Sequence, residues 1–203
     1  MRSKGQLIVI SGPSGAGKGT VCEALLKKNN FWISVSATTR SPRNSEIDGV
    51  NYYFISREEF LERIESKDFL EYAQVYGNCY GTPKSEVLKV LETGRDVILE
   101  IDIQGALKVK MAYPNGLFIF ILPPSMEELR NRITNRGSET PESLMTRFTS
   151  AHEEISFVSK YDYAVVNDTV DSACEKIQSI VIAERCRVDR MNGDFLKEEI
   201  INE

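Results

Sequence analysis

The chain is organised around the stretch Gly12-Pro13-Ser14-Gly15-Ala16-Gly17-Lys18-Gly19-Thr20. It follows an apolar run, Leu7-Ile8-Val9-Ile10-Ser11, and precedes a segment at 21–28 whose composition is typical of a helix. A buried strand, a glycine loop and a helix in this order are the context that a phosphate-binding P-loop requires. The glycines let the backbone turn so that several N–H groups converge on phosphate oxygens, and the helix adds the positive end of its dipole.

Lys18 gives this loop a mobile positive charge that can reach terminal phosphates. The alternative is a glycine-rich turn that binds nothing, and the spacing of Gly12, Gly17 and Lys18 argues against it. Gly19 stands where a Ser or Thr commonly contacts Mg²⁺, and the hydroxyl comes one residue later, at Thr20. The sequence therefore predicts phosphate binding and leaves direct metal ligation by the loop open.

The composition is that of an ordinary globular protein. Of 203 residues, 41% are hydrophobic and 27% charged, which suits one domain with inserted subdomains. The net charge of −5 lacks the basic footprint of a nucleic-acid-binding protein. The four cysteines have no CxxC spacing, and no apolar run approaches the roughly 18 residues of a membrane span. We expect a cytoplasmic protein with reduced thiols that binds neither nucleic acid nor membranes.

Three further apolar runs are typical of buried strands. They lie at 96–102, 117–122 and 163–168, and segments with helical patterns lie at about 105–112, 126–135, 142–157 and 170–190. Apolar runs that alternate with helices predict an α/β fold with a parallel sheet flanked by helices. Ligands of such sheets bind at the carboxyl ends of the strands, where the glycine loop, Asp102 and Asn167 would lie. The tail at 192–203 has the pattern of an amphipathic helix, and its role is not disclosed by the sequence.

The region from 37 to 84 is rich in Tyr, Ser, Thr and Arg. A strand at 31–36 is expected to precede it, and the region itself has strand patterns at 50–55, 69–76 and 79–82 and helical patterns at 57–65 and 83–92. Ser56 and Glu59 have the spacing of a capping box at the start of the first helix. We therefore expect a small mixed α/β insertion.

Two arginines on the loop of this insertion, Arg40 and Arg43, can bind a phosphate in a fork-like manner. Tyrosine hydroxyls nearby would add donors without further charge. The alternative is a pair of solvated arginines beside tyrosines that pack as ordinary strand residues. Glu71, inside an apolar alternation, is either a recognition carboxylate or the polar side of a half-exposed strand.

Taken together, these motifs resemble the guanylate kinase family, whose members move the terminal phosphoryl group of ATP to GMP. The resemblance runs nearly end to end, through the glycine loop and the stretches 36–43, 49–54, 71–73, 80–82, 101–105 and 161–163. The block Thr38-Thr39-Arg40, with a second arginine three residues on, is far more specific than the loop alone. The resemblance implies a P-loop kinase core, a mixed α/β GMP-binding insertion and a helical lid.

The resemblance also implies roles for single residues. ATP would bind along the glycine loop, with Asn167 bordering the adenine or serving as a structural cap. The GMP site would contain phosphate ligands, Arg40, Arg43, Tyr52 and Tyr80, and guanine ligands, Ser36, Glu71 and Thr82, with Glu100 or Asp102 nearby. Mg²⁺ would enter as MgATP, and its candidate protein ligands, direct or through water, are Thr20 and Asp102.

A second arginine cluster, Arg130, Arg132, Arg136 and Arg147, surrounds a polar loop at 136–143. Arginines on a mobile lid can neutralise the charge that spreads over a phosphoryl group in transit, and closure excludes water. Arg136 and Arg147 align best with the lid arginines of the family, and with Lys18 they are the candidate catalytic residues. Arg130 is better explained as part of a solvated helix face.

The sequence thus predicts a single guanylate kinase-like domain with a core at 1–36, 85–125 and 155–203. A GMP-binding subdomain would occupy 37–84 and a lid 126–154. Two alternatives differ in function. One is a scaffold domain of the same fold that binds phosphorylated partners without catalysis, and the retained Lys18 argues against it. The other is a kinase for another nucleotide, in which the interpretation of Ser36 and Glu71 would be wrong.

Overall fold

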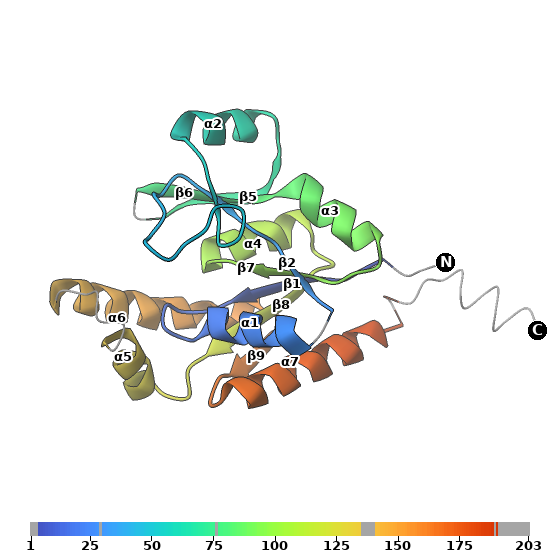
Figure 1. Ribbon diagram of the computed structural model, residues 1–203. Coiled ribbons are helices and arrows are strands. Elements are labelled where there is room, and N and C mark those ends of the chain that lie inside the picture. The colour runs from blue at the N-terminus through green and yellow to red at the C-terminus, as the bar shows by residue number, and fades with distance from the viewer. Residues whose placement is uncertain (1–3, 29, 76, 135–140, 189, 191–203) are drawn as a thin grey trace, which may run out of the picture.

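The computed structural model describes residues 4–28, 30–75, 77–134, 141–188 and 190, and only the backbone over 141–147 (Figure 1). Its centre is a parallel five-stranded sheet in the order β2-β7-β1-β8-β9. The strands are β1 (Leu7–Ser11), β2 (Trp32–Ile33), β7 (Val97–Glu100), β8 (Leu117–Leu122) and β9 (Tyr163–Val166). The parallel sheet expected from the apolar runs is confirmed.

Helices cover both faces of this sheet (Figure 1). Ile8 and Ile10 of β1 lie in an apolar cluster with residues of α1 (Lys18–Lys28) and α7 (Val170–Arg185). Leu7 and Val9 lie in a second cluster with residues of α3 (Lys84–Glu92) and α4 (Ile103–Ala112). Successive side chains of a strand point to opposite faces, so an uninterrupted apolar run is what a strand buried on both sides requires.

A second, mixed sheet lies beyond the core sheet, with α2 (Arg57–Glu65) on its outer side (Figure 1). Its order is β4-β3-β6-β5, formed by β3 (Ala37–Thr38), β4 (Tyr53–Phe54), β5 (Phe69–Val75) and β6 (Asn78–Pro83). Phe60 of α2 packs with Phe69 and Ala37 in a small apolar cluster of its own. Ser56 caps α2 by accepting from the Glu59 N–H, as the capping-box spacing predicts.

The strand expected at 31–36 is confirmed only for Trp32 and Ile33, which form β2. Trp32 and Ile33 pair with β7 in the core sheet, whereas Ala37 and Thr38 pair with β4 and β6 in the second sheet. The residues between them carry the chain from one sheet to the other, with the Ser36 carbonyl accepting from the Tyr53 N–H at 2.9 Å. The expected strand therefore ends early, and β3 of the second sheet begins one residue beyond the expected range.

Beyond β8, α5 (Met126–Thr134), α6 (Pro141–Ile155) and a 3-10 turn (Ser156–Lys160) lead to β9. The helix α7 ends at Arg185, earlier than the pattern at 170–190 predicts. The loop at 136–140 and the tail at 192–203 lie outside the described residues. Across the residues that the structure describes, no helix has the length and apolar character needed to cross a membrane.

Candidate active site

The glycine loop joins β1 to α1, at the carboxyl end of the first strand. Gly12, Gly15 and Gly17 all have positive φ angles, of 144°, 87° and 89°. A Cβ at Gly12 would lie 2.3 Å from the Ile121 carbonyl oxygen, and one at Gly17 would lie 2.5 Å from Nδ2 of Asn167. Both the turn and the close packing therefore require glycine, which explains the spacing read from the sequence.

Asn167 follows β9 and is buried. Its Nδ2 donates to the Ala16 carbonyl at 2.8 Å, so the side chain ties the glycine loop to the end of β9, two strands away from β1. Arg132 of α5 donates to the Asn167 carbonyl at 3.2 Å and pairs with Glu128 at 2.8 Å, which brings its guanidinium beside Gly17. The adenine contact expected of Asn167 stays a prediction, and the structural role is observed.

The Lys18 ammonium lies over this loop. Its Nζ donates to the carbonyls of Gly12 at 2.6 Å and of Pro13 at 3.0 Å. The charge is therefore held where the backbone turns, at the start of α1. Thr20 follows two residues later with an exposed side chain.

Glu154 is a member of this site that sequence reasoning missed. Its Oε2 accepts from the Ser14 N–H at 3.1 Å, which joins α6 to the loop across 140 positions of sequence. Burial raises the pKa of the Glu154 carboxyl, while the Ser14 N–H and the charge of Lys18 oppose the rise. The signal was present in the helical period, because Glu154 lies one turn after the buried Ala151, whereas Glu153 points to solvent.

The second sheet carries a cationic cluster around Arg40. Its guanidinium makes two bonds to the Glu46 carboxylate, at 2.8 and 2.9 Å, and lies 5.5 Å from the Tyr52 ring centroid. The rings of Tyr52 and Tyr80 meet edge to face at 5.9 Å. Arg40 lowers the pKa of Glu46, and Glu46 and Tyr80 raise that of Arg40.

Arg43 is exposed at the same loop, and its N–H donates to Glu46 at 2.7 Å. The structure therefore brings Arg40, Tyr52 and Tyr80 together and places Arg43 at the rim. Glu46, which organises this loop, is a further residue that the sequence reasoning did not single out.

Glu71 is buried, with 7% of its surface exposed. It lies on the inward face of β5 with Phe69 and Ala73, and its Oε1 accepts from the buried Thr82 hydroxyl at 2.8 Å. Burial raises its pKa to about 7, against the opposing bond from Thr82. A Cβ at Gly105 would lie 2.7 Å from Oε2 of Glu71, so α4 also packs closely on this carboxylate. The half-exposed strand alternative for Glu71 is wrong.

The end of β7 lies between the glycine loop and the second sheet. Glu100 approaches within 3.5 Å of the Cβ position of Gly19. Burial raises the pKa of both Cys22 and Tyr52, and the charge of Glu100 adds to the rise. Asp102 caps α4, with Oδ1 accepting from the Gly105 N–H at 2.9 Å. Ser36 is half-buried at the start of the second sheet.

The candidate metal ligands form no preassembled site. In the described part of the chain, no group of three or more His, Cys, Asp or Glu side chains could hold a metal ion. Asp102 commits one oxygen to its helix cap, and Thr20 offers a single hydroxyl. This donor set suits Mg²⁺ that arrives on a nucleotide and takes most ligands from phosphates and water.

The lid arginines are only partly placed. Arg136 lies outside the described residues, and Arg147 is placed as a backbone position in α6. Leu129 and Ile133 of α5 pack with Ala151 of α6. The same two α5 side chains lie within 3.0 Å of the Cβ position of Gly15, so this helical pair rests on the glycine loop.

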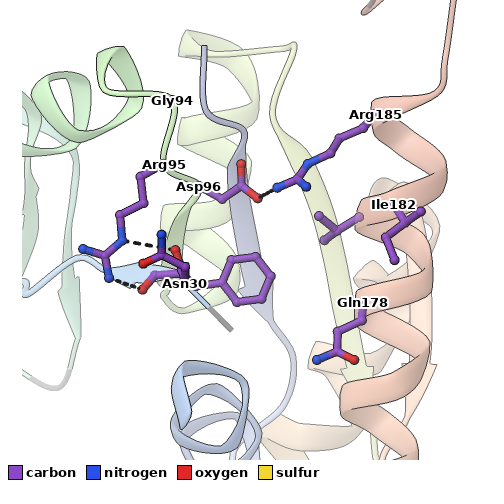
Figure 2. A pocket seen from close by; sticks show the side chains of 9 residues that line it. Asn30, Gly94, Arg95, Asp96, Gln178, Ile182 and Arg185 are labelled. Atoms are coloured by element: carbon purple, nitrogen blue, oxygen red, sulfur yellow. Dashed lines mark hydrogen bonds and ion pairs between the residues drawn. The ribbon is translucent and has the colours of Figure 1, made fainter. Parts of the chain in front are cut away.

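A separate cavity of about 360 Å³ lies at the amino end of β7, beside α7 (Figure 2). Asp96 there pairs with Arg185, and Arg95 donates to the carbonyls of Asn30 at 3.1 Å and Phe31 at 2.7 Å. A larger hollow of about 890 Å³ adjoins it. Because these charged groups bond to protein atoms, the cavity in Figure 2 is explained as a structural ion-pair region that joins α7 to the sheet.

A parallel sheet whose first strand enters a glycine loop and a helix, with a lysine over the loop, defines the class of P-loop nucleotide-binding proteins. Comparison with known proteins narrows this class. A guanylate kinase family model matches residues 4–184. The chain belongs to the guanylate kinase family.

Individual relatives agree over almost the whole length. The guanylate kinase of Clostridium tetani is 68% identical over 202 residues, covering 98% of this chain and 97% of that protein. The guanylate kinase of Caldanaerobacter subterraneus subsp. tengcongensis is 62% identical over 198 residues, covering 97% and 96%. The crystal structure of guanylate kinase from Anaplasma phagocytophilum superposes with a TM-score of 0.82 at 36% identity, covering 98% and 97%.

Proposed function

We infer that the chain transfers the terminal phosphoryl group of ATP to GMP, giving ADP and GDP. The observation that carries this inference is the buried Glu71 carboxylate beside Thr82, at a site separate from the glycine loop. A loop for phosphate alone would indicate any P-loop protein. The second site has a cation, Arg40, and a buried carboxylate, Glu71. This pair supports a phosphoryl acceptor that carries a phosphate and a base rich in hydrogen-bond donors.

The glycine loop and Lys18 would bind the phosphates of MgATP. Phosphoryl transfer needs mainly positioning and charge neutralisation, because the transferred group spreads negative charge over its oxygens. Lys18 would supply one positive charge, and Arg132, beside Gly17, would supply another with the lid arginines Arg136 and Arg147. The transfer would be in line, from MgATP to the GMP phosphate, without a covalent enzyme intermediate.

Glu71 would read the guanine. This base presents N1–H and N2–H₂ donors on one edge, and an ionised carboxylate can accept from both. The Ser36 hydroxyl would donate to O6, and Thr82 would hold the carboxylate in place through its 2.8 Å bond. With adenine, an ionised Glu71 would face a lone pair and remain a buried, unpaired charge. Sites of this kind reject an analogue by roughly 10⁴–10⁵.

The acceptor phosphate would bind at Arg40 and Arg43 with the hydroxyls of Tyr52 and Tyr80. The subdomain at 37–84 would carry this site, and the segment at 126–154 would act as the lid. Glu100 or Asp102, at the end of β7, would lie between the two nucleotides. The cytoplasmic location expected from the cysteine spacing stays a prediction.

A coupled assay of ADP release with GMP, AMP, CMP and UMP as acceptors tests the proposal. The expected result is turnover with GMP and at least about 10³-fold lower efficiency with AMP. Equal or greater efficiency with another monophosphate would overturn the assignment of the base. Absence of ADP release with all four, from protein that binds both nucleotides, would favour the scaffold alternative.

A further inference from the structure

The Ser14 N–H belongs to the glycine loop, whose backbone donors cradle phosphates in this class of site. In the structure this donor is bonded to a carboxylate, because Oε2 of Glu154 accepts from it at 3.1 Å. A carboxylate oxygen and a phosphate oxygen are chemically similar acceptors for a backbone N–H. Glu154 therefore occupies a position of the kind that a nucleotide phosphate uses.

The contact is held by packing as well as by this bond. Ala151, one turn before Glu154 on the same face of α6, is buried against Leu129 and Ile133 of α5. Those two side chains also reach within 3.0 Å of the Cβ position of Gly15. Glu154 is thus delivered to the loop by a helical pair that already rests on it.

The charges around Glu154 give the contact a second consequence. Burial raises the pKa of the Glu154 carboxyl, and the Ser14 N–H and the charge of Lys18 oppose this rise. An anion at this position shares the field of the lysine that the nucleotide phosphates need, and it repels those phosphates. A phosphate can accept from the Ser14 N–H only when it displaces Glu154. The displacement also removes the repulsion between the phosphate and the carboxylate.

We propose that Glu154 is an internal competitor of the nucleotide phosphates at the glycine loop, and that ATP binding releases α6 from Ser14. This proposal rests on the proposed function, since it concerns the donor nucleotide of that reaction. Glu154 is a positioning residue here. It couples occupancy of the loop to the placement of α6, the helix that carries the candidate lid residue Arg147.

In the opposite role, Glu154 supports the conformation of the glycine loop, and it keeps its bond from the Ser14 N–H when ATP is bound. The two roles give opposite results in a pair of variants. Glu154→Gln keeps an oxygen that can accept from Ser14 and removes the charge, whereas Glu154→Ala removes both. If Glu154 competes with the nucleotide, both variants should bind nucleotide more tightly. If Glu154 supports the loop, only the alanine variant should differ, and it should bind nucleotide more weakly.

The experiment is calorimetric titration of the full chain with ADP, with a non-hydrolysable ATP analogue and with GMP. We expect Glu154→Ala and Glu154→Gln to lower the Kd of ADP and of the analogue by about 5- to 20-fold, as expected for loss of a charge-assisted bond and of repulsion. GMP affinity should change by less than about twofold. Glu153→Gln, the exposed neighbour on α6, is the matched control and should leave all three affinities unchanged.

Unchanged affinity in both variants, or weaker binding in Glu154→Ala with unchanged binding in Glu154→Gln, would overturn the proposal. Circular dichroism of each variant establishes that it is folded before titration. Failure of the proposed function has a different signature, because the wild-type chain itself would then bind no ATP analogue or show no transfer to GMP.

Discussion

The two proposed phosphate sites of this molecule are built from different donors. The glycine loop uses backbone N–H groups within nine consecutive residues, three of them glycines with positive φ. The second site uses side chains, with Arg40 on a loop and Tyr52 and Tyr80 brought to it by β4 and β6. Backbone donors need only a local conformation, whereas side-chain donors need the whole second sheet to be paired correctly. The first site is therefore easier to predict from the sequence.

The sites also share a feature, since an internal carboxylate is bonded to a donor in each. Glu154 accepts from the glycine loop, and it comes from a helix distant in sequence. Glu46 accepts from Arg40, and it comes from the same loop as Arg40. A distant carboxylate can leave with its helix, whereas a local one moves with its partner. We therefore expect competition at the first site and support at the second.

The largest expected effect follows from removing the charge of the first site. Lys18→Ala should lower kcat by about 10²–10³, the usual cost of one preorganised donor at a developing transition-state charge. Lys27→Ala, exposed on the same helix, is the control and should keep wild-type turnover. ADP release measures the rates and circular dichroism the fold. Near-normal turnover by folded Lys18→Ala would contradict the P-loop assignment.

The second-largest expected effect follows from a substitution in the second site. Glu71→Gln should lower kcat/KM for GMP by at least about tenfold, because an amide accepts at one atom only and its NH₂ opposes a guanine donor. The KM for ATP should stay within about twofold, since Glu71 lies on β5 of the second sheet, whereas the glycine loop follows β1 of the core sheet. Initial-rate kinetics with each substrate varied in turn separates the two values. Weaker ATP binding with unchanged GMP efficiency would place the acceptor site elsewhere.

The raised pKa of Glu71 makes the second site sensitive to pH. With a value of about 7 in the protein, the carboxylate is mostly protonated at pH 6 and mostly ionised at pH 8. GMP needs the ionised form, so its Kd should fall by about tenfold over this range, as expected for one titrating group. Glu71→Gln should remove that part of the change and leave only the titration of the GMP phosphate. Equal pH profiles for the two proteins would contradict this.

The raised pKa of Glu71 also predicts how the free energy of unfolding depends on pH. Glu71 ordinarily titrates near 4.5 and titrates at about 7 in the folded chain, so the folded state binds more protons between these values. The free energy of unfolding should therefore fall as pH rises from about 5 to 7, through this group, and the fall should be absent in Glu71→Gln. Urea unfolding at several pH values measures it. A steeper fall in the variant than in the wild type would contradict the shift.

The sequence predicts more of the fold than of the site. Continuous apolar runs identified β1, β7 and β8, because a strand covered on both faces has no polar side. The run at 163–168 contains the edge strand β9, in which only Val165 is buried. The strand expected at 31–36 is shorter than its alternating pattern predicts, because only Trp32 and Ile33 pair with β7 before the chain crosses to the second sheet. The glycine loop was predicted residue by residue, because its conformation is set locally.

The internal carboxylates could not be found in this way. Glu46 and Glu154 stand among other acidic residues, and only folding shows which of these approaches a donor. The apolar alternation around Glu71 left its role open, and only the family resemblance pointed to guanine. Its burial depends on contacts from α4 and β6 that no local pattern contains.

The smallest expected effect follows from a substitution at Glu46, which tests whether this carboxylate behaves differently from Glu154. Glu46 makes two bonds to Arg40 and accepts from the Arg43 N–H, and the Arg40 and Glu46 side chains are only 18% and 13% exposed. If this carboxylate supports the arginine loop, Glu46→Gln should raise the KM for GMP by about two- to fivefold, because the amide keeps one of the two acceptors and opposes the other donor. The KM for ATP should not change, and Glu58→Gln, exposed on α2, is the control. A lower KM for GMP in Glu46→Gln would mean that both sites carry a competing carboxylate, and that the origin of each carboxylate, local or distant, does not decide its role.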